Sequence, residues 1–154
     1  MKHKYILLLT LFLICLVIPV YADELIEVEY NPENIASSDA QVIVNTSTAE
    51  ICLSDTQQCF PTLIGPTTPL GVYNLTLYTT HKKGYGGDIL GFKIQGDFIF
   101  ALHRVWLGKP SERRLERLRS ATSADNHITN GCINVENEVY DLIKSRYYRT
   151  IKII

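Results

Sequence analysis

Short runs in which hydrophobic and polar residues alternate follow one another along most of the chain, and this pattern is typical of half-buried β-strands. Residues 71–78 alternate most cleanly. Clusters of Asn, Ser, Thr and Asp, together with Gly65 and Pro66, separate the runs and mark turns. The pattern predicts strands at residues 42–44, 49–53, 59–64, 71–78, 89–94, 98–103 and 150–154.

Helical patterns occur only in the second half of the chain. Pro110 and Ser111 precede a stretch without helix breakers, which predicts a short helix at residues 112–120. A second helix is predicted at residues 137–147, with an apolar face made of Val139, Leu142, Ile143 and Tyr147. Because 154 residues give room for a single domain, we expect one mainly β domain with one or two short helices.

The N-terminus has the features of a secretory signal peptide. Basic residues at positions 2–4 precede an apolar run at residues 5–18, and small residues lead up to Ala22. A membrane anchor is the alternative, but this run is shorter than the roughly 20 residues that a spanning helix needs. We therefore predict a signal peptide at residues 1–22, a polar lead-in at 23–40 and a domain at 41–154. The protein would be exported to the periplasm or cell-wall space, with membrane contact only through the signal peptide.

Composition excludes several partners. The net charge of -1 gives no long-range attraction to nucleic acid. Cys132, His103 and His127 could in principle bind zinc, but the chain has no pair of closely spaced metal ligands, so we expect no metal and no cofactor. We expect a monomer.

Three cysteines remain after the predicted cleavage, and in an oxidising compartment two of them should pair. Cys52 and Cys59 flank a predicted hairpin turn and would lie opposite each other if the tight turn spans residues 54–57. Two reduced, buried thiols are the alternative. If the two do pair, Cys132 is the odd thiol.

Cys132 is a candidate nucleophile, although a free cysteine is more often an inert core residue. Its neighbours Thr129, Asn130, Gly131 and Asn134 are poor core residues. The glycine would let the backbone approach a ligand, and nearby N–H groups could face an oxyanion. We also expect a helix to begin directly after this segment, so that its positive end favours the thiolate.

A nucleophilic cysteine needs a base, and His103 is the leading candidate because it ends a predicted strand. His81 and His127 lie in predicted loops, where histidines are usually solvated. Tyr85 either lines the mouth of the cleft or belongs to a surface loop. Trp106 is either a cleft wall or a core residue.

Two segments and His103 resemble the L,D-transpeptidase family, in its YkuD-type catalytic domain. Residues 67–73 are similar to its Thr-Pro-x-Gly-x-aromatic stretch, and residues 129–134 to its Ser/Thr-His-Gly-Cys-hydrophobic-Asn/Arg signature. His103 closes a strand as the family's catalytic His does. The resemblance extends from about residue 41 to the C-terminus and implies a β-sandwich with the site in a cleft.

The resemblance implies a role for each matching residue. Cys132 would attack a tetrapeptide stem of peptidoglycan and form a thioester, and an amine of an acceptor stem would resolve it into a 3→3 cross-link. His103 would be the base, with its ring oriented by the backbone carbonyl of Arg104. N–H groups of Gly131 and Cys132 would form the oxyanion hole. Substrate would be contacted by Asn134, Asn130, Thr129, Trp106 and Tyr85.

Two departures from the family pattern leave alternatives open. Asn130 stands where the common signature has His, which affects the fit of substrate rather than proton transfer. The segment between His103 and Cys132 is longer than usual, and its insertion, residues 107–127, is rich in Arg. This insertion is either a basic lid for peptide carboxylates or a solvated helix packed by Leu115 and Leu118. Hydrolysis by an L,D-carboxypeptidase and a non-catalytic peptidoglycan-binding module remain the alternative functions.

Overall fold

The computed structural model describes residues 26–27 and 40–154. The predicted signal peptide and most of the predicted polar lead-in lie outside these residues. In the part that is described, no helix has the length and apolar character needed to cross a membrane.

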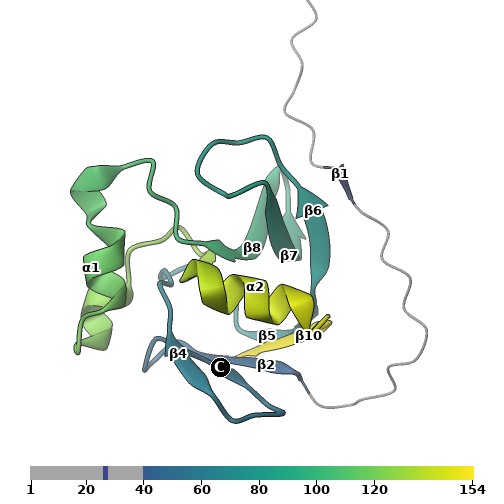
Figure 1. The fold of residues 1–154 in the computed structure, drawn as a ribbon, viewed down its shortest axis with the longest axis horizontal. Helices are drawn as coiled ribbons and strands as arrows, with labels where there is room; N and C mark the ends of the chain where they lie inside the picture. Colours follow the sequence, from purple (N-terminus) through teal and green to yellow (C-terminus); the bar gives the residue numbers. More distant parts are fainter. Residues whose placement is uncertain (1–25, 28–39) are drawn as a thin grey trace, which may run out of the picture.

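Two five-stranded sheets form the body of the protein (Figure 1). The first sheet has the strand order β1-β6-β7-β8-β9, and the second has the order β4-β3-β2-β10-β5. The strands are β1 (Ile26–Glu27), β2 (Val42–Asn45), β3 (Glu50–Leu53), β4 (Cys59–Pro61), β5 (Gly71–Asn74), β6 (Thr76–Thr79), β7 (Asp88–Gln95), β8 (Phe98–Arg104), β9 (Ile133–Val135) and β10 (Thr150–Ile153).

A single apolar core joins the two sheets and one helix. Alternate residues of β2, β3 and β10 are buried from the second sheet, as the period-2 pattern predicted. Helix α2 (Asn137–Ser145) adds Val139, Tyr140 and Ile143 to the same core and lies between the sheets in Figure 1. The prediction of a mainly β fold with two sheets and short helices is confirmed.

The predicted strand at residues 71–78 is in fact two strands in different sheets. β5 pairs with β10 in the second sheet, whereas β6 pairs with β7 in the first. Leu75 lies between them, is 5% exposed, and its N–H donates to the Arg149 carbonyl over 2.7 Å. The alternation of residues continues through Leu75 because Tyr73, Leu75 and Leu77 all pack into the same core, so the pattern did not reveal the change of sheet.

The segment after Cys132 is a strand and not the start of a helix. β9 follows Cys132 directly and runs parallel to β8, with His103 opposite Asn134. Helix α2 begins only at Asn137. The prediction that a helix N-terminus stabilises a Cys132 thiolate is therefore wrong.

The insertion at residues 107–127 folds into short helical turns that stand to one side of the sheets (Figure 1). These are η1 (Pro110–Glu112), α1 (Arg114–Leu118) and η2 (Ser123–Asn126). Leu118 is fully buried and packs with Leu63 and Val105 in a second small cluster. Leu115, in contrast, is 38% exposed, so only one of the two leucines anchors the segment.

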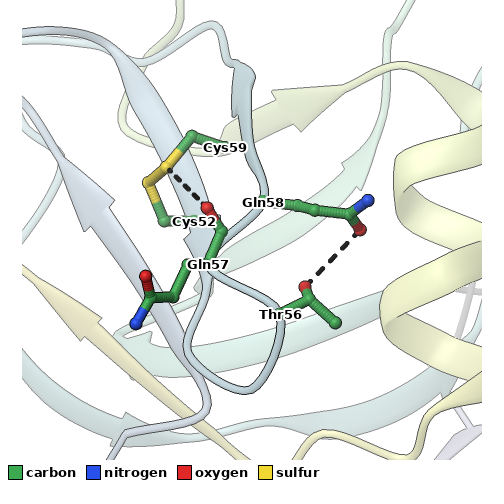
Figure 2. Close-up of a disulfide and its surroundings, with 5 residues drawn as sticks. All are labelled: Cys52, Thr56, Gln57, Gln58 and Cys59. Carbon is green, nitrogen blue, oxygen red and sulfur yellow. Dashed lines mark hydrogen bonds between the residues drawn. A yellow bond between two sulfur atoms is a disulfide. The ribbon is translucent and has the colours of Figure 1, made fainter.

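Cys52 and Cys59 form a disulfide across the β3–β4 hairpin (Figure 2). The two residues lie opposite each other in the strand pairing, and their Cα atoms are 4.0 Å apart. The Gln57 N–H donates to the Leu53 carbonyl and closes the turn. The predicted pairing is confirmed, and Cys132 is the free cysteine of the described residues.

A cluster of ion pairs ties the end of β8 to β7 and α2. Arg104 donates to Asp88 and to Asp141 over 2.6 Å each, and its guanidinium lies over the Tyr140 ring at 4.1 Å. Lys144 of α2 is also paired with Asp88. Since Arg104 directly follows His103, this cluster fixes the backbone that carries the candidate base.

Removing the disulfide by the double substitution Cys52→Ser and Cys59→Ser is expected to lower the free energy of unfolding by about 2–3 kcal/mol. The disulfide closes a short loop and so restricts the unfolded chain. Without it, the unfolded chain gains conformational entropy and becomes more stable relative to the folded state. Urea unfolding measures the loss. A thiol reductant should destabilise the wild type by a similar amount and leave the double variant unaffected. Equal stability of the variant and the oxidised wild type would contradict a stabilising role.

Asp88→Asn is expected to lower the free energy of unfolding by about 1–3 kcal/mol at pH 7, because it leaves two cations without their shared carboxylate. Burial alone would raise the pKa of Asp88, but hydrogen bonds from Lys144 and Arg104 outweigh it and lower the pKa. The stabilisation is thus complete above the unfolded pKa of about 4 and disappears as the pH falls through the lower folded-state value.

The difference between Asp88→Asn and the wild type should therefore shrink in acid, as followed by urea unfolding at several pH values. Asp55→Asn is the matched control, because Asp55 pairs with Arg146 at the surface with 49% of its side chain exposed. This control should change stability little at any pH. A loss of stability for Asp88→Asn that does not depend on pH would argue against the ion pairs as its cause.

Candidate active site

His103 and Cys132 line the same cleft, which has a volume of about 300 Å³. The cleft opens beside the hairpin of β7 and β8 and is also lined by Thr80, Lys82, Tyr85, Ile89, Asp97, Phe98, Ile99 and Ala101. His103 comes from β8, and Cys132 immediately precedes β9. The parallel pairing of these two strands brings together residues that are far apart in sequence.

The His103 ring is held by its own strand. Its Nδ1 lies 2.7 Å from the backbone carbonyl of Arg104. Because a carbonyl only accepts hydrogen bonds, Nδ1 carries the proton and Nε2 presents its lone pair. This is the tautomer that a general base acting through Nε2 requires. The side chain is 2% exposed.

Asn134 contacts the other nitrogen of the same ring. Its Nδ2 lies 3.2 Å from His103 Nε2, and the residue is fully buried. The resemblance implied substrate contact for Asn134, whereas its burial against the ring places it in a supporting position. Sequence reasoning did not find this contact, because it depends on the register of β8 against β9.

The Cys132 thiol is partly exposed to the cleft. Its Sγ lies 3.7 Å from the Ile99 carbonyl, to which the thiol donates. A thiol has one proton to donate, and the lone pair of Nε2 is occupied by Asn134. In this conformation, therefore, the thiol and the imidazole each bond to another partner while facing the same cleft.

Both groups are uncharged in this resting arrangement. Burial raises the pKa of the Cys132 thiol more than a hydrogen bond with the Ala101 backbone and the charge of Arg114 lower it. Burial also lowers the pKa of His103 to about 4, with the Arg104 carbonyl opposing this change and the Arg114 charge adding to it. The cleft thus holds a thiol and a neutral imidazole, not a preformed thiolate and imidazolium.

The loop before Cys132 is braced from inside by Thr129. Its Oγ1 donates to the Cys132 carbonyl over 2.6 Å and accepts from the Gly131 N–H over 3.1 Å. Thr129 is 4% exposed and does not line the cleft, so its side chain supports the loop in this structure. The Gly131 N–H donates to this hydroxyl and does not stand free as an oxyanion donor here.

Gly131 is required for packing instead. Its φ is +107°, and a Cβ there would lie 2.6 Å from the Phe100 ring and 2.7 Å from Thr67 Oγ1. Thr67 also donates to the Asn130 carbonyl over 2.9 Å, while the Asn130 residue itself is exposed. The two segments that carry the family resemblance, residues 67–73 and 129–134, are therefore in direct contact.

The two aromatic candidates lie in different places. Tyr85 lines the cleft, and its ring meets the His103 ring edge-on with centroids 4.7 Å apart. Trp106 instead lines a separate hollow of about 280 Å³ formed with the insertion. Its indole N–H donates to the Lys83 carbonyl over 3.3 Å. Tyr85 is at the predicted cleft mouth, whereas Trp106 is not a wall of the cleft that holds Cys132.

The remaining histidines of the described chain lie at the surface. His81 and His127 are both exposed, and neither lines the cleft. Among residues 26–27 and 40–154, no three His, Cys, Asp or Glu residues gather as a metal site would need.

Comparisons with known proteins find a likeness in structure only. No family model and no curated protein matches the sequence. The fold is similar to the crystal structure of Mycobacterium tuberculosis L,D-transpeptidase 1, with 12% sequence identity over 73% of this chain and a TM-score of 0.41. The chain spans 57% of the length of that protein. The likeness concerns the arrangement of the chain and does not extend to activity.

Proposed function

We propose that this protein is an exported, cysteine-dependent acyltransferase of the L,D-transpeptidase type that acts on peptidoglycan stem peptides. The observation that carries the proposal is the shared cleft of Cys132 and His103, in which the Arg104 carbonyl selects the tautomer that leaves Nε2 as the base. The contact between the two family-like segments supports it independently, because Thr67 and Asn130 meet beside the nucleophile.

In the proposed reaction, Cys132 Sγ attacks the carbonyl carbon of the amide that follows the L-centre of a tetrapeptide stem. The thiol proton passes to His103 Nε2 as the sulfur–carbon bond forms. The carbon–nitrogen bond then breaks, and the leaving D-amino acid takes that proton on its amine. The product of this half-reaction is a thioester on Cys132.

The second half-reaction resolves the thioester. The amine of an acceptor stem attacks the carbonyl carbon, loses its proton to His103, and the thiol returns as the sulfur leaves. With the Gly131 N–H bonded to Thr129, the Cys132 N–H is the donor that we assign to the developing oxyanion. Attack by water in place of the amine would give hydrolysis by the same site.

Cys132→Ala is expected to abolish release of the terminal D-residue from a disaccharide tetrapeptide, because no other thiol lines the cleft. Mass spectrometry of the products gives the measurement, and unchanged thermal unfolding of the variant serves as the control for folding. In the wild type, a cross-linked dimer indicates transfer, a tripeptide alone indicates hydrolysis, and unchanged substrate that still binds indicates a binding module. Turnover retained by the variant would remove the assignment of Cys132.

Alkylation of Cys132 by iodoacetamide is expected to be slow at pH 7 and to accelerate only as the pH rises past the ordinary cysteine pKa of about 8.5. Burial raises the pKa of this thiol, and the reactive thiolate is populated only as the pH approaches that raised value. Mass spectrometry of the peptide that contains Cys132 follows the rate, with the urea-unfolded chain as reference. Rapid alkylation with no pH dependence between pH 5 and 8 would instead indicate a thiolate–imidazolium pair.

A further inference from the structure

Arg114 of the insertion reaches Asn134 of the site, whereas Leu118 of the same helix packs into the second apolar cluster. The Arg114 side chain is 11% exposed, whereas its neighbour Arg113 is 70% exposed and pairs with Glu116 at the surface. Arg114 therefore differs from Arg113 in burial as well as in its partners.

Arg114 is held in place by three contacts. Its Nε donates to Glu112 over 2.7 Å, and its Nη1 donates to Asn134 Oδ1 over 2.7 Å. The guanidinium also lies 5.1 Å from the centre of the Trp106 ring. A planar guanidinium with fixed donors can hold a carboxylate and an amide at once, which a lysine ammonium cannot do in the same geometry.

This contact fixes which way the Asn134 amide points. An arginine only donates hydrogen bonds, so the atom of Asn134 that faces it must be the carbonyl oxygen. The amide nitrogen then faces His103 Nε2 and donates to its lone pair. The hydrogen bonds run in one direction from Arg114 through Asn134 and His103 to the Arg104 carbonyl.

We propose that Arg114 is a positioning residue for His103, and that it acts by locking the Asn134 amide so that its N–H caps Nε2 in the resting enzyme. A proton on Nε2 would place two donors face to face, Nε2–H and the Asn134 N–H. A flip of the amide would relieve this contact but would place its N–H against the Arg114 donor. Nε2 must therefore exchange the amide for the Cys132 thiol before proton transfer. That His103 acts as a base rests on the proposed function. That its ring is held in one orientation and one tautomer does not.

Several titratable side chains lie near His103, and Lys82 and Asp97 line the same cleft. Arg114 disfavours the imidazolium by its charge. Cys132 and Tyr85 share the cleft with the ring and are themselves influenced by Arg114. A test of the lock has to separate this charge from the orientation of the amide.

The test is an NMR titration of the His103 ring nitrogens in the wild type and in three variants. Arg114→Gln removes both the charge and the lock, Arg114→Lys retains the charge, and Arg113→Gln removes a neighbouring charge that does not touch Asn134. In wild type at pH 7, Nδ1 should carry the proton and Nε2 should be an unprotonated acceptor.

We expect both Arg114 variants to raise the pKa of His103 by about one unit or more, a tenfold change in the protonation equilibrium, because the freed Asn134 oxygen can accept from Nε2–H. The acid limb of kcat/KM should move up by the same amount. Arg113→Gln should leave both unchanged.

A wild-type pKa preserved in Arg114→Lys would overturn the proposal, since charge alone would then account for the effect. So would a proton on Nε2 in the wild type at pH 7, a result that does not depend on any variant folding. The titration needs no substrate, so its outcome stays separate from the turnover test of Cys132→Ala.

Discussion

The candidate site depends on the parallel pairing of β8 with β9. This pairing sets His103 opposite Asn134 and brings Cys132 to the edge of the same cleft, although 31 residues separate the histidine from the asparagine. A shift of one residue in a strand register turns side chains to the opposite face, so the register itself determines whether these groups meet. The ion pairs of Arg104 hold β8 in this register, and the three buried residues of β9 hold the partner strand.

Burial within this strand pairing explains the uncharged state of His103, because burial lowers the pKa of the ring more than the hydrogen bond to the Arg104 carbonyl raises it. His103 is buried against its own strand carbonyl and the Asn134 amide, and both contacts favour one neutral tautomer. Burial also raises the pKa of Cys132, so the thiol is the resting form of this side chain. In the chemistry that we propose, His103 therefore removes the thiol proton only after substrate has bound. No thiolate is present before that step.

The insertion belongs to the site as well as to the surface. Leu118 fixes it to the second apolar cluster, and Arg114 extends from it to Asn134. Neither of the two alternatives that the sequence offered describes this arrangement. Much of the segment is exposed, as one alternative held, yet the Arg114 side chain is only 11% exposed and contacts the Asn134 amide that faces His103.

The sequence by itself determined the local features of the protein. Alternation located most of the strands but not β1 or β9, the turn between Cys52 and Cys59 indicated the disulfide, and residue chemistry singled out Cys132 and His103. The tertiary structure alone decided that the chain changes sheet at Leu75, that β9 follows Cys132, that Thr129 points inward and that Arg114 reaches Asn134. Periodicity reports which side of a segment is buried, because burial acts on each residue locally. It does not report which distant segment covers that side, and every contact among His103, Asn134 and Arg114 depends on that choice.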